Sequence, residues 1–287
     1  MICNLCPRRC GVDRSEKAGF CALPEGLRLA RAALHFWEEP VISGEKGSGT
    51  VFFSGCNLRC VYCQNHDISA GGFGREISAA RLREIFEELI AQGAHNINLV
   101  TPSHLVPWIM PALEPKLPVP VVYNCGGYES VETLRLLENK VDIWLPDLKY
   151  ADSDLAGKLS AAPDYFEIAT AAIGEMYRQA GDYVIENGLM KRGVIIRHLV
   201  LPGQLENTKR CIDWVSRTFQ PGQVLFSLMA QYTPQPGAEG VLARHVTFGE
   251  YRAAVEYMEN CGIVDGFTQL RTSAKEEYTP PFDLTGV

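Results

Sequence analysis

One stretch of the chain directs the interpretation of the rest: residues 54–65, which read Ser54-Gly55-Cys56-Asn57-Leu58-Arg59-Cys60-Val61-Tyr62-Cys63-Gln64-Asn65. It places three cysteines in a C-x3-C-x2-C pattern, with Tyr62 directly before the last of them. A cubane cluster has four irons, and three thiolates from one loop can hold three of them. The fourth iron would stay open to a substrate or cofactor, as the open position of a catalytic zinc site does. The pattern therefore predicts a [4Fe–4S] cluster bound by Cys56, Cys60 and Cys63.

A structural zinc site is the alternative that this spacing leaves open. A zinc knuckle would use the same three cysteines with a fourth ligand from elsewhere in the chain. The stretch before the loop, Thr50-Val51-Phe52-Phe53, is a short apolar run that reads as a buried strand. The loop would then stand at the carboxyl end of a sheet, where barrel active sites are built. We therefore favour the iron–sulfur interpretation.

From residue 50 onward the chain alternates between apolar strands and amphipathic helices. Ser78 reads as a helix N-cap, and Gly93 ends the helix that follows. The apolar runs predict strands at 50–53, 96–100, 118–123, 142–145, 193–200, 224–229 and 266–270. Helical spacing predicts helices at 78–92, 130–139, 163–180, 207–219 and 248–260, with a proline-punctuated helix before residue 118. This alternation implies an α/β fold with a parallel sheet, for which a barrel or partial barrel fits best and a doubly wound sheet is the competitor.

The first fifty residues look irregular and carry a second group of cysteines. Cys3, Cys6, Cys10 and Cys21 follow a C-x2-C-x3-C-x10-C spacing. Four thiolates so close in the chain suit either a structural zinc ion or a second iron–sulfur cluster. A zinc ion would stabilise the fold of this segment, whereas an iron–sulfur cluster would relay electrons or bind substrate. We expect residues 1–49 to form a metal-binding extension, with iron–sulfur as the preferred metal, and residues 50–287 to form the barrel.

Composition and charge limit the class of protein. The chain has 287 residues, of which 46% are hydrophobic and 21% charged, which is typical of a soluble globular protein. Its net charge of −7 argues against bulk nucleic-acid binding, which needs a basic face. We see neither a signal peptide nor an apolar run of about 20 residues that would span a bilayer. We therefore expect a cytoplasmic protein whose ten cysteines are reduced, with Cys125, Cys211 and Cys261 as buried thiols.

The cysteine loop resembles the signature of the radical S-adenosylmethionine superfamily, with Tyr62 as its customary aromatic residue. Its Cys-Gln-Asn ending and the run Gly47-Ser48-Gly49-Thr50-Val51-Phe52-Phe53-Ser54-Gly55-Cys56 are similar to the glycyl-radical-enzyme activases, in particular to a subgroup resembling pyruvate formate-lyase activating enzyme. Three further segments agree with that subgroup: Leu145-Pro146-Asp147-Leu148-Lys149-Tyr150, Arg197-His198-Leu199-Val200-Leu201-Pro202-Gly203 and Ala230-Gln231-Tyr232-Thr233-Pro234. The resemblance covers nearly the whole chain and implies a partial (β/α)6 TIM-type barrel.

The resemblance also implies an activity. S-adenosylmethionine would bind the open iron, and an electron from ferredoxin or flavodoxin would reduce the cluster. Reductive cleavage would then yield methionine and a 5′-deoxyadenosyl radical that abstracts a hydrogen atom. The subgroup implies a glycine of a partner enzyme as the hydrogen donor. A small molecule or a peptide, including a substrate for sulfur insertion, stays open, as does an iron–sulfur electron carrier without radical chemistry.

The resemblance assigns cofactor contacts to the carboxyl ends of the predicted strands. The superfamily's Gly-Gly-Glu segment, which contacts the cofactor's amino group, is replaced here by Val100-Thr101-Pro102-Ser103, so backbone carbonyls or Thr101 would take that role. Activases carry an Asp-x-Lys beside the methionine carboxylate, and Asp147 and Lys149 match it. The full set of expected cofactor-binding residues is Tyr62, Asn65, Thr101, Asn124, Asp147, Lys149, Arg197, His198 and Gln231.

These residues also have structural interpretations. Asp147 and Lys149 lie two apart on a strand and point the same way, so they could form only an ion pair at the barrel mouth. His198 could be a hydrogen-bonded core histidine, and Asn124 a turn residue. We favour the functional interpretation because these residues fall at successive strand ends, where a shared pocket must form.

Overall fold

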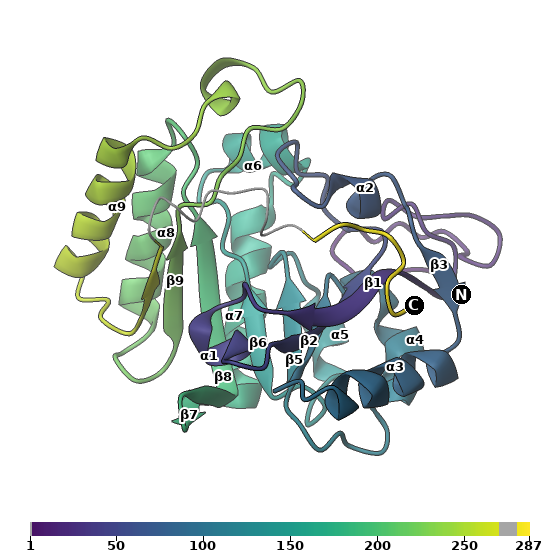
Figure 1. The fold of residues 1–287 in the computed structure, drawn as a ribbon. Coiled ribbons are helices and arrows are strands. Elements are labelled where there is room, and N and C mark those ends of the chain that lie inside the picture. Colours follow the sequence, from purple (N-terminus) through teal and green to yellow (C-terminus); the bar gives the residue numbers. More distant parts are fainter. Residues whose placement is uncertain (1, 270–279) are drawn as a thin grey trace.

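Strands and helices alternate along the chain and build one open sheet with helices packed on its outer face (Figure 1). The computed structural model describes residues 2–269 and 280–287. In these residues the strands are β1 (Leu27–His35), β2 (Ser48–Phe53), β3 (Arg75–Ile77), β4 (Ile97–Val100), β5 (Val121–Cys125), β6 (Ile143–Pro146), β7 (Val184–Glu186), β8 (Leu189–Leu199), β9 (Leu225–Met229) and β10 (Gly266–Thr268). The α-helices are α1 (Pro40–Ser43), α2 (His66–Ser69), α3 (Ala79–Ala91), α4 (Val106–Ile109), α5 (Val131–Arg135), α6 (Ser153–Ser160), α7 (Tyr165–Ala180), α8 (Leu205–Thr218) and α9 (Phe248–Asn260). Short 3-10 helices are η1 (Ser103–Leu105), η2 (Met110–Leu113) and η3 (Gly240–Ala243).

The parallel strands occur in the sheet in the order in which they occur in the chain. β2, β4, β5, β6, β8, β9 and β10 pair in this sequence, each parallel to the next. A doubly wound sheet reverses its strand order at a switch point, whereas a barrel-type sheet does not. The expected α/β fold with a partial TIM-type barrel is therefore confirmed, and the sheet stays open. The last expected strand is observed as β10, and Leu270 at its expected end lies outside the described residues.

The expectation that the first fifty residues are irregular is wrong for residues 27–43. Strand β1 pairs antiparallel with β2 along most of its length and with β3 at its beginning, so it extends the sheet. The C-terminal residues cross it, and the backbone N–H of Ala32 donates to the carbonyl of Thr285 at 2.8 Å. Arg28 and Arg31 interrupt the apolar pattern of β1, which is why periodicity did not reveal it. Turns and one isolated bridge make up residues 2–26.

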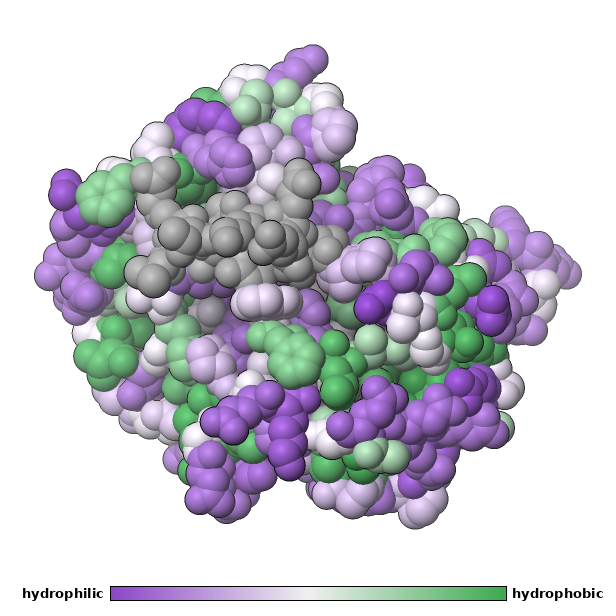
Figure 2. Space-filling view, viewed as in Figure 1, coloured by the Kyte–Doolittle hydropathy of each residue, from purple (hydrophilic) through white to green (hydrophobic). Residues whose placement is uncertain are grey.

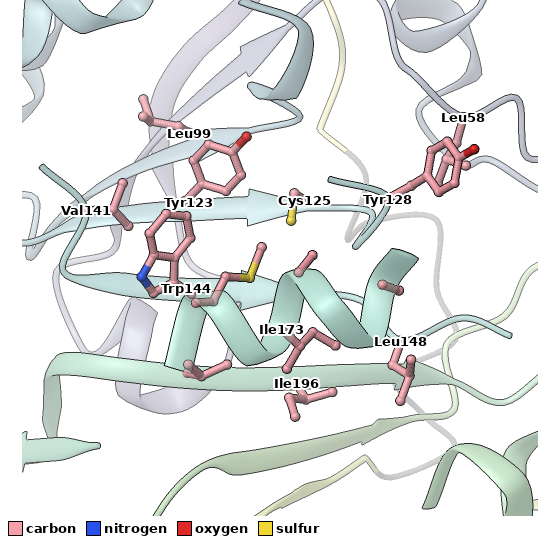
Figure 3. Close-up of a cluster of buried hydrophobic side chains, with 14 of the residues drawn as sticks. Leu58, Leu99, Tyr123, Cys125, Tyr128, Val141, Trp144, Leu148, Ile173 and Ile196 are labelled. Carbon is pink, nitrogen blue, oxygen red and sulfur yellow. The ribbon is translucent and has the colours of Figure 1, made fainter. Parts of the chain in front are cut away.

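Alternate residues of the parallel strands face outward, toward the helices. Trp144 of β6 and Ile196 of β8 belong to the same buried cluster as Ile173 of α7 (Figure 3). The rings of Trp144 and Tyr123, which come from neighbouring strands, have centroids 5.2 Å apart. Burial of apolar surface stabilises by roughly 25 cal/mol per Å², so this layer contributes most of what holds the helices to the sheet.

The intervening residues face the lumen of the partial barrel. Near the amino ends of the strands the lumen is apolar, and its core cluster consists of Ile42, Val122, Ile143, Leu145, Met190, Ile195 and Leu225. Further along the same face of the strands come Asn124, Asp147 and Arg197. The lumen is therefore closed by apolar side chains at one end and polar at the other, where the sequence predicted the site.

Helix α3 shows how a helix of the outer layer meets both the sheet and the solvent. Ser78 caps it, as expected, by accepting a hydrogen bond from the N–H of Arg81. Its apolar face is buried and consists of Leu82, Ile85, Phe86 and Leu89. On the other face Arg81 pairs with Glu84 and Glu88, and Figure 2 shows hydrophilic residues over this helix. No helix within residues 2–269 and 280–287 is long and apolar enough to cross a membrane.

A buried carboxyl group lies in the segment that follows β5. The hydroxyl of Tyr123 donates to Glu129 Oε2 at 3.0 Å, and the hydroxyl of Ser103 donates to Oε1. Burial raises the pKa of Glu129 to about 7, although both hydroxyl donors act in the opposite direction. The network joins the segments that follow β4 and β5, so it helps to hold the carboxyl ends of two neighbouring strands together.

We expect the variant Glu129→Gln to alter the pH dependence of stability. Because the pKa rises from 4.5 to about 7 on folding, the carboxyl group contributes fully below pH 4.5, and its contribution is lost as the pH rises to about 7. At 1.36 kcal/mol per pKa unit, the loss amounts to roughly 3 kcal/mol. Urea unfolding between pH 4.5 and 8 should show the wild type losing stability relative to the variant, which cannot ionise there. Parallel profiles for the two proteins would contradict this prediction.

Candidate active site

The cysteine loop leaves the carboxyl end of β2 and packs against the N-terminal segment. Gly55 has a φ of +78°, a left-handed conformation that favours glycine. A Cβ atom at this position would lie 2.7 Å from the carbonyl oxygen of Cys21. Both constraints account for glycine directly before the first signature cysteine, and they place the backbone of residue 21 against the loop.

Each signature cysteine has a hydrogen-bonding neighbour at its sulfur. A backbone N–H of the loop donates to Cys56 Sγ at 3.3 Å, and the Ser160 hydroxyl donates to Cys60 Sγ at 3.0 Å. The hydroxyl oxygen of Ser69 lies 3.3 Å from Cys63 Sγ. Hydrogen bonds to sulfur tune iron–sulfur clusters. The surroundings of the three thiols therefore fit the cluster that their spacing predicts.

Tyr62 anchors the loop to the helical layer. Its hydroxyl lies 2.6 Å from that of Tyr150, which in turn lies 2.6 Å from Ser160 Oγ at the end of α6. Since Ser160 also donates to Cys60, one chain of hydroxyl groups connects the aromatic residue of the loop with a signature cysteine. Burial raises the pKa of Tyr62 well above its ordinary value, so the phenol stays neutral.

Arg197 is the centre of a buried network of charges at the carboxyl ends of the strands. Its guanidinium donates to Asp147 Oδ1 at 2.9 Å, to Asn124 Oδ1 at 2.6 Å and to Glu38 Oε2 at 3.3 Å. Lys149 pairs with the other oxygen of Asp147. The network thus joins β5, the end of β6, β8 and the segment between β1 and α1.

Opposite charges in this network offset the effect of burial on the pKa of their partners. Burial alone would raise the pKa of Asp147, but the charges of Arg197 and Lys149 hold it below its ordinary value. Burial would lower the pKa of Lys149, but the carboxylate of Asp147 raises it. Burial raises the pKa of Glu38, which Arg197 only partly offsets. Asp147 therefore stays ionised, and Glu38 is the carboxyl group that takes up a proton more readily.

A cavity lies against this network and is shared by the cysteine loop. Cys60 and Cys63 line it, and the charges of both help to raise the pKa of Cys56, which burial raises most. The cavity also contains most of the residues that the resemblance assigned to the cofactor, namely Tyr62, Asn65, Asn124, Asp147, Lys149, Arg197 and Gln231. The signature cysteines and the charged network therefore face one space.

Two of the expected cofactor contacts lie outside this cavity. His198 is on the outer face of β8, where its Nδ1 lies 2.6 Å from Leu148 O and its Nε2 lies 3.0 Å from Thr208 Oγ1 of α8. Burial lowers its pKa to about 4. His198 therefore faces α8 and does not line the cavity, which fits the alternative of a hydrogen-bonded core histidine. Thr101 has a φ of +60°, donates its backbone N–H to the neighbouring strand and does not line the cavity.

Glu38 is the main residue of the site that sequence reasoning missed. Its carboxylate accepts from Asn98 Nδ2 at 3.0 Å and from Asn124 Nδ2 at 3.2 Å, in addition to the arginine. Because β1 runs antiparallel to β2, Glu38 enters the lumen from the end opposite to the cysteine loop. The alternation of apolar and charged residues in Leu27-Arg28-Leu29 is a weak signal of β1. A prediction of this strand would have made the acidic residues after it candidates for the site.

The four N-terminal cysteines lie in the segment of turns that makes up residues 2–26. Cys3, Cys6 and Cys21 are buried, and Cys10 is half-buried. Burial raises the pKa of Cys6 to about 12, and the charges of Cys10 and Cys21 contribute to the rise. Among the described residues, no group of three or more His, Cys, Asp or Glu side chains is compact enough to hold a single metal ion, which applies to both cysteine sets. The second metal site remains a prediction.

Comparisons with known proteins agree with the signature loop. The family model described as the Radical SAM superfamily matches residues 50–215, more than half of the chain. The uncharacterized protein MJ0674 of Methanocaldococcus jannaschii is 32% identical over 276 residues, which cover 91% of this chain and 75% of that protein.

Solved structures share the fold at low sequence identity. SuiB of Streptococcus suis bound to S-adenosylmethionine gives a TM-score of 0.52 at 12% identity, over 75% of this chain and 48% of SuiB. The same protein bound to its precursor peptide SuiA gives 0.53 at 14% identity, over 75% and 46% of the two chains. Methylornithine synthase (PylB) gives 0.50 at 16% identity, over 72% and 59%. The chain thus spans about half the length of SuiB, and the likeness shows the fold alone.

We expect Asp147→Asn to destabilise the protein strongly. The change leaves Lys149 buried without its carboxylate and leaves Arg197 paired with Glu38 alone, and removal of one partner of a buried ion pair costs about 3–5 kcal/mol. Glu76→Gln, which removes the exposed partner of Arg28, is the matched control and should cost less than about 1 kcal/mol. Urea unfolding at pH 7 measures both. Equal losses in the two variants would show that the network stabilises no more than a surface pair.

Proposed function

Because the chain belongs to the Radical SAM superfamily, we propose that it is an enzyme that uses a [4Fe–4S] cluster to cleave S-adenosylmethionine reductively. One observation carries the proposal: the cysteine loop and the network around Arg197 line the same cavity. When bound, the cluster and the sulfonium cofactor supply the difficult chemistry, which is one-electron cleavage to methionine and a 5′-deoxyadenosyl radical that abstracts a hydrogen atom. A low-potential protein of the ferredoxin or flavodoxin class supplies the electron.

The residues of the chain hold and orient these groups. Cys56, Cys60 and Cys63 hold the cluster, and the hydrogen bonds to their sulfurs fix the thiolates. The methionine end of the cofactor carries an ammonium and a carboxylate. Asp147 stays ionised and Lys149 stays protonated, so the cavity offers each charged group an opposite charge.

Neutral polar and aromatic side chains form the remaining walls of the cavity. Asn65, Asn124 and Gln231 offer amide donors and acceptors to the cavity without adding charge. Trp37 and Tyr232 line it as well. Large side chains that exclude water also exclude stray hydrogen donors, which a reactive radical would otherwise attack.

As the hydrogen donor we propose a polypeptide, with a glycine of a partner enzyme as the specific case. The similarity of residues 47–65, 145–150, 197–203 and 230–234 to the activase subgroup supports this choice. A protein with the same fold, SuiB, has been solved with a precursor peptide. A small molecule, or a substrate for sulfur insertion, is the competing class. Transfer of deuterium from a labelled polypeptide into 5′-deoxyadenosine would distinguish the two classes.

We expect Cys60→Ala to abolish the release of 5′-deoxyadenosine. The variant removes one of the three thiolates and the acceptor of the Ser160 hydroxyl, so the cluster is lost or misplaced. The assay uses anaerobically reconstituted protein, dithionite and S-adenosylmethionine, with the product measured by chromatography. Cys211→Ala, which changes a buried cysteine of α8, is the matched control and should retain the activity.

Two outcomes would contradict the proposed function. Wild-type protein that takes up iron but neither binds nor cleaves S-adenosylmethionine would be an iron–sulfur electron carrier. Zinc in place of iron at the signature cysteines would make the loop a structural knuckle. Iron and zinc content per chain, measured on the same preparation, separates the two.

A further inference from the structure

The N-terminal segment and the signature loop are in direct contact. Arg8 Nε donates to the carbonyl of Asn57 at 2.8 Å, and Arg59 donates in return to the carbonyl of Phe20 at 3.0 Å. The backbone of Cys21 lies against Gly55, the residue before the first signature cysteine, and this is a third contact. In Figure 1 the coil of this segment, in purple, lies on the same side of the molecule as α2, the helix that follows the loop. The two groups of cysteines are therefore neighbours.

Arg8 of the N-terminal segment is connected to Cys60, a ligand of the proposed cluster, through one other residue, Ser160. Arg8 stands between Cys6 and Cys10 in the chain, and its guanidinium also donates to the carbonyl of Ser160 at 3.1 Å. The hydroxyl of Ser160 donates to Cys60 Sγ. A continuous path of hydrogen bonds and covalent bonds thus connects the N-terminal cysteines with the signature cysteines.

The N-terminal thiols have the surroundings of metal ligands. The backbone N–H of Phe20 donates to Cys10 Sγ at 3.3 Å, which repeats the amide-to-sulfur hydrogen bond at the first signature cysteine. Arg14 is fully buried, and its guanidinium donates to the carbonyls of Pro24 and His104 rather than to a carboxylate. Its charge acts on Cys21. A buried cation costs several kcal/mol unless a negative group compensates it, and a thiolate-bound metal centre carries that negative charge.

We propose that Cys3, Cys6, Cys10 and Cys21 bind a second [4Fe–4S] cluster that relays electrons to the signature cluster, which rests on the function proposed above. An external low-potential donor is oxidised by one electron and reduces the second cluster. That electron then moves to the signature cluster, and the second cluster returns to its oxidised state. Zinc has no redox chemistry, so it would hold the N-terminal segment in place without transferring electrons. Cys10 is the more exposed of the four ligands, so it marks the edge at which the donor approaches.

Metal content tests the identity of the site without any turnover. After anaerobic reconstitution the wild type should contain about eight irons per chain, Cys6→Ala/Cys10→Ala about four, and the control Cys211→Ala about eight. Mössbauer spectra should show two [4Fe–4S] clusters in the wild type and one in the double variant. About four irons together with one zinc in the wild type would overturn the proposal. This measurement on the wild type is decisive even if the double variant does not fold, and its failure would leave the proposed cleavage of S-adenosylmethionine standing.

The choice of reductant tests the relay. Dithionite reaches both clusters, whereas reduced flavodoxin must dock at the protein surface. We expect the ratio of the flavodoxin-driven to the dithionite-driven rate of 5′-deoxyadenosine formation to fall at least about tenfold in the double variant, a loss of 1.36 kcal/mol or more. Cys10→Ala alone, at the half-buried position, is a milder variant for the same comparison. An unchanged ratio in a folded variant that has lost four irons would overturn the relay.

Discussion

A guanidinium taken out of water must be given partners, and the partners of Arg197 hold the carboxyl end of this barrel together. Its hydrogen bonds reach Asn124 of β5, Asp147 directly after β6 and Glu38 in the segment between β1 and α1. Desolvation of each ion costs several kcal/mol, so the network is stable only when all partners are delivered at once. The parallel strands deliver Asn124 and Asp147 because they end at the same edge, whereas Glu38 follows the antiparallel strand β1 and arrives from the opposite end.

The same network sets the electrostatics of the cavity. The carboxylate of Asp147 pairs with the cations Arg197 and Lys149, and Glu38 lies beside them, yet the separate charges remain available to a zwitterionic ligand. Lys149 connects the network with the cysteine loop, since its charge opposes the rise that burial causes in the pKa of Cys60. In the proposed function, the residues assigned to the cofactor and those assigned to the cluster therefore overlap.

A loop with three candidate metal ligands needs support from its surroundings to keep them in place. Here the support comes from two sides. Helix α6 supplies the hydroxyl that bonds Cys60, and the N-terminal segment presses its backbone against Gly55. The residues at these contacts are small or are held by hydrogen bonds of their own, which restricts the positions that the loop can adopt.

The sequence by itself determined the spacing of the cysteines, the order of strands and helices and most of the residues around the cavity. The order of strands and helices follows from local periodicity, and the residues around the cavity follow from the resemblance of the strand ends to a known family and from the rule that parallel strands end at one edge. None of these requires knowledge of distant contacts. Strict alternation along β8 would even have placed His198 on the face opposite to Arg197. Only the tertiary structure decided that Glu38 joins the network and that residues 2–26 pack on the signature loop. Both depend on the register of β1 and on contacts between residues far apart in the chain, which no local pattern encodes.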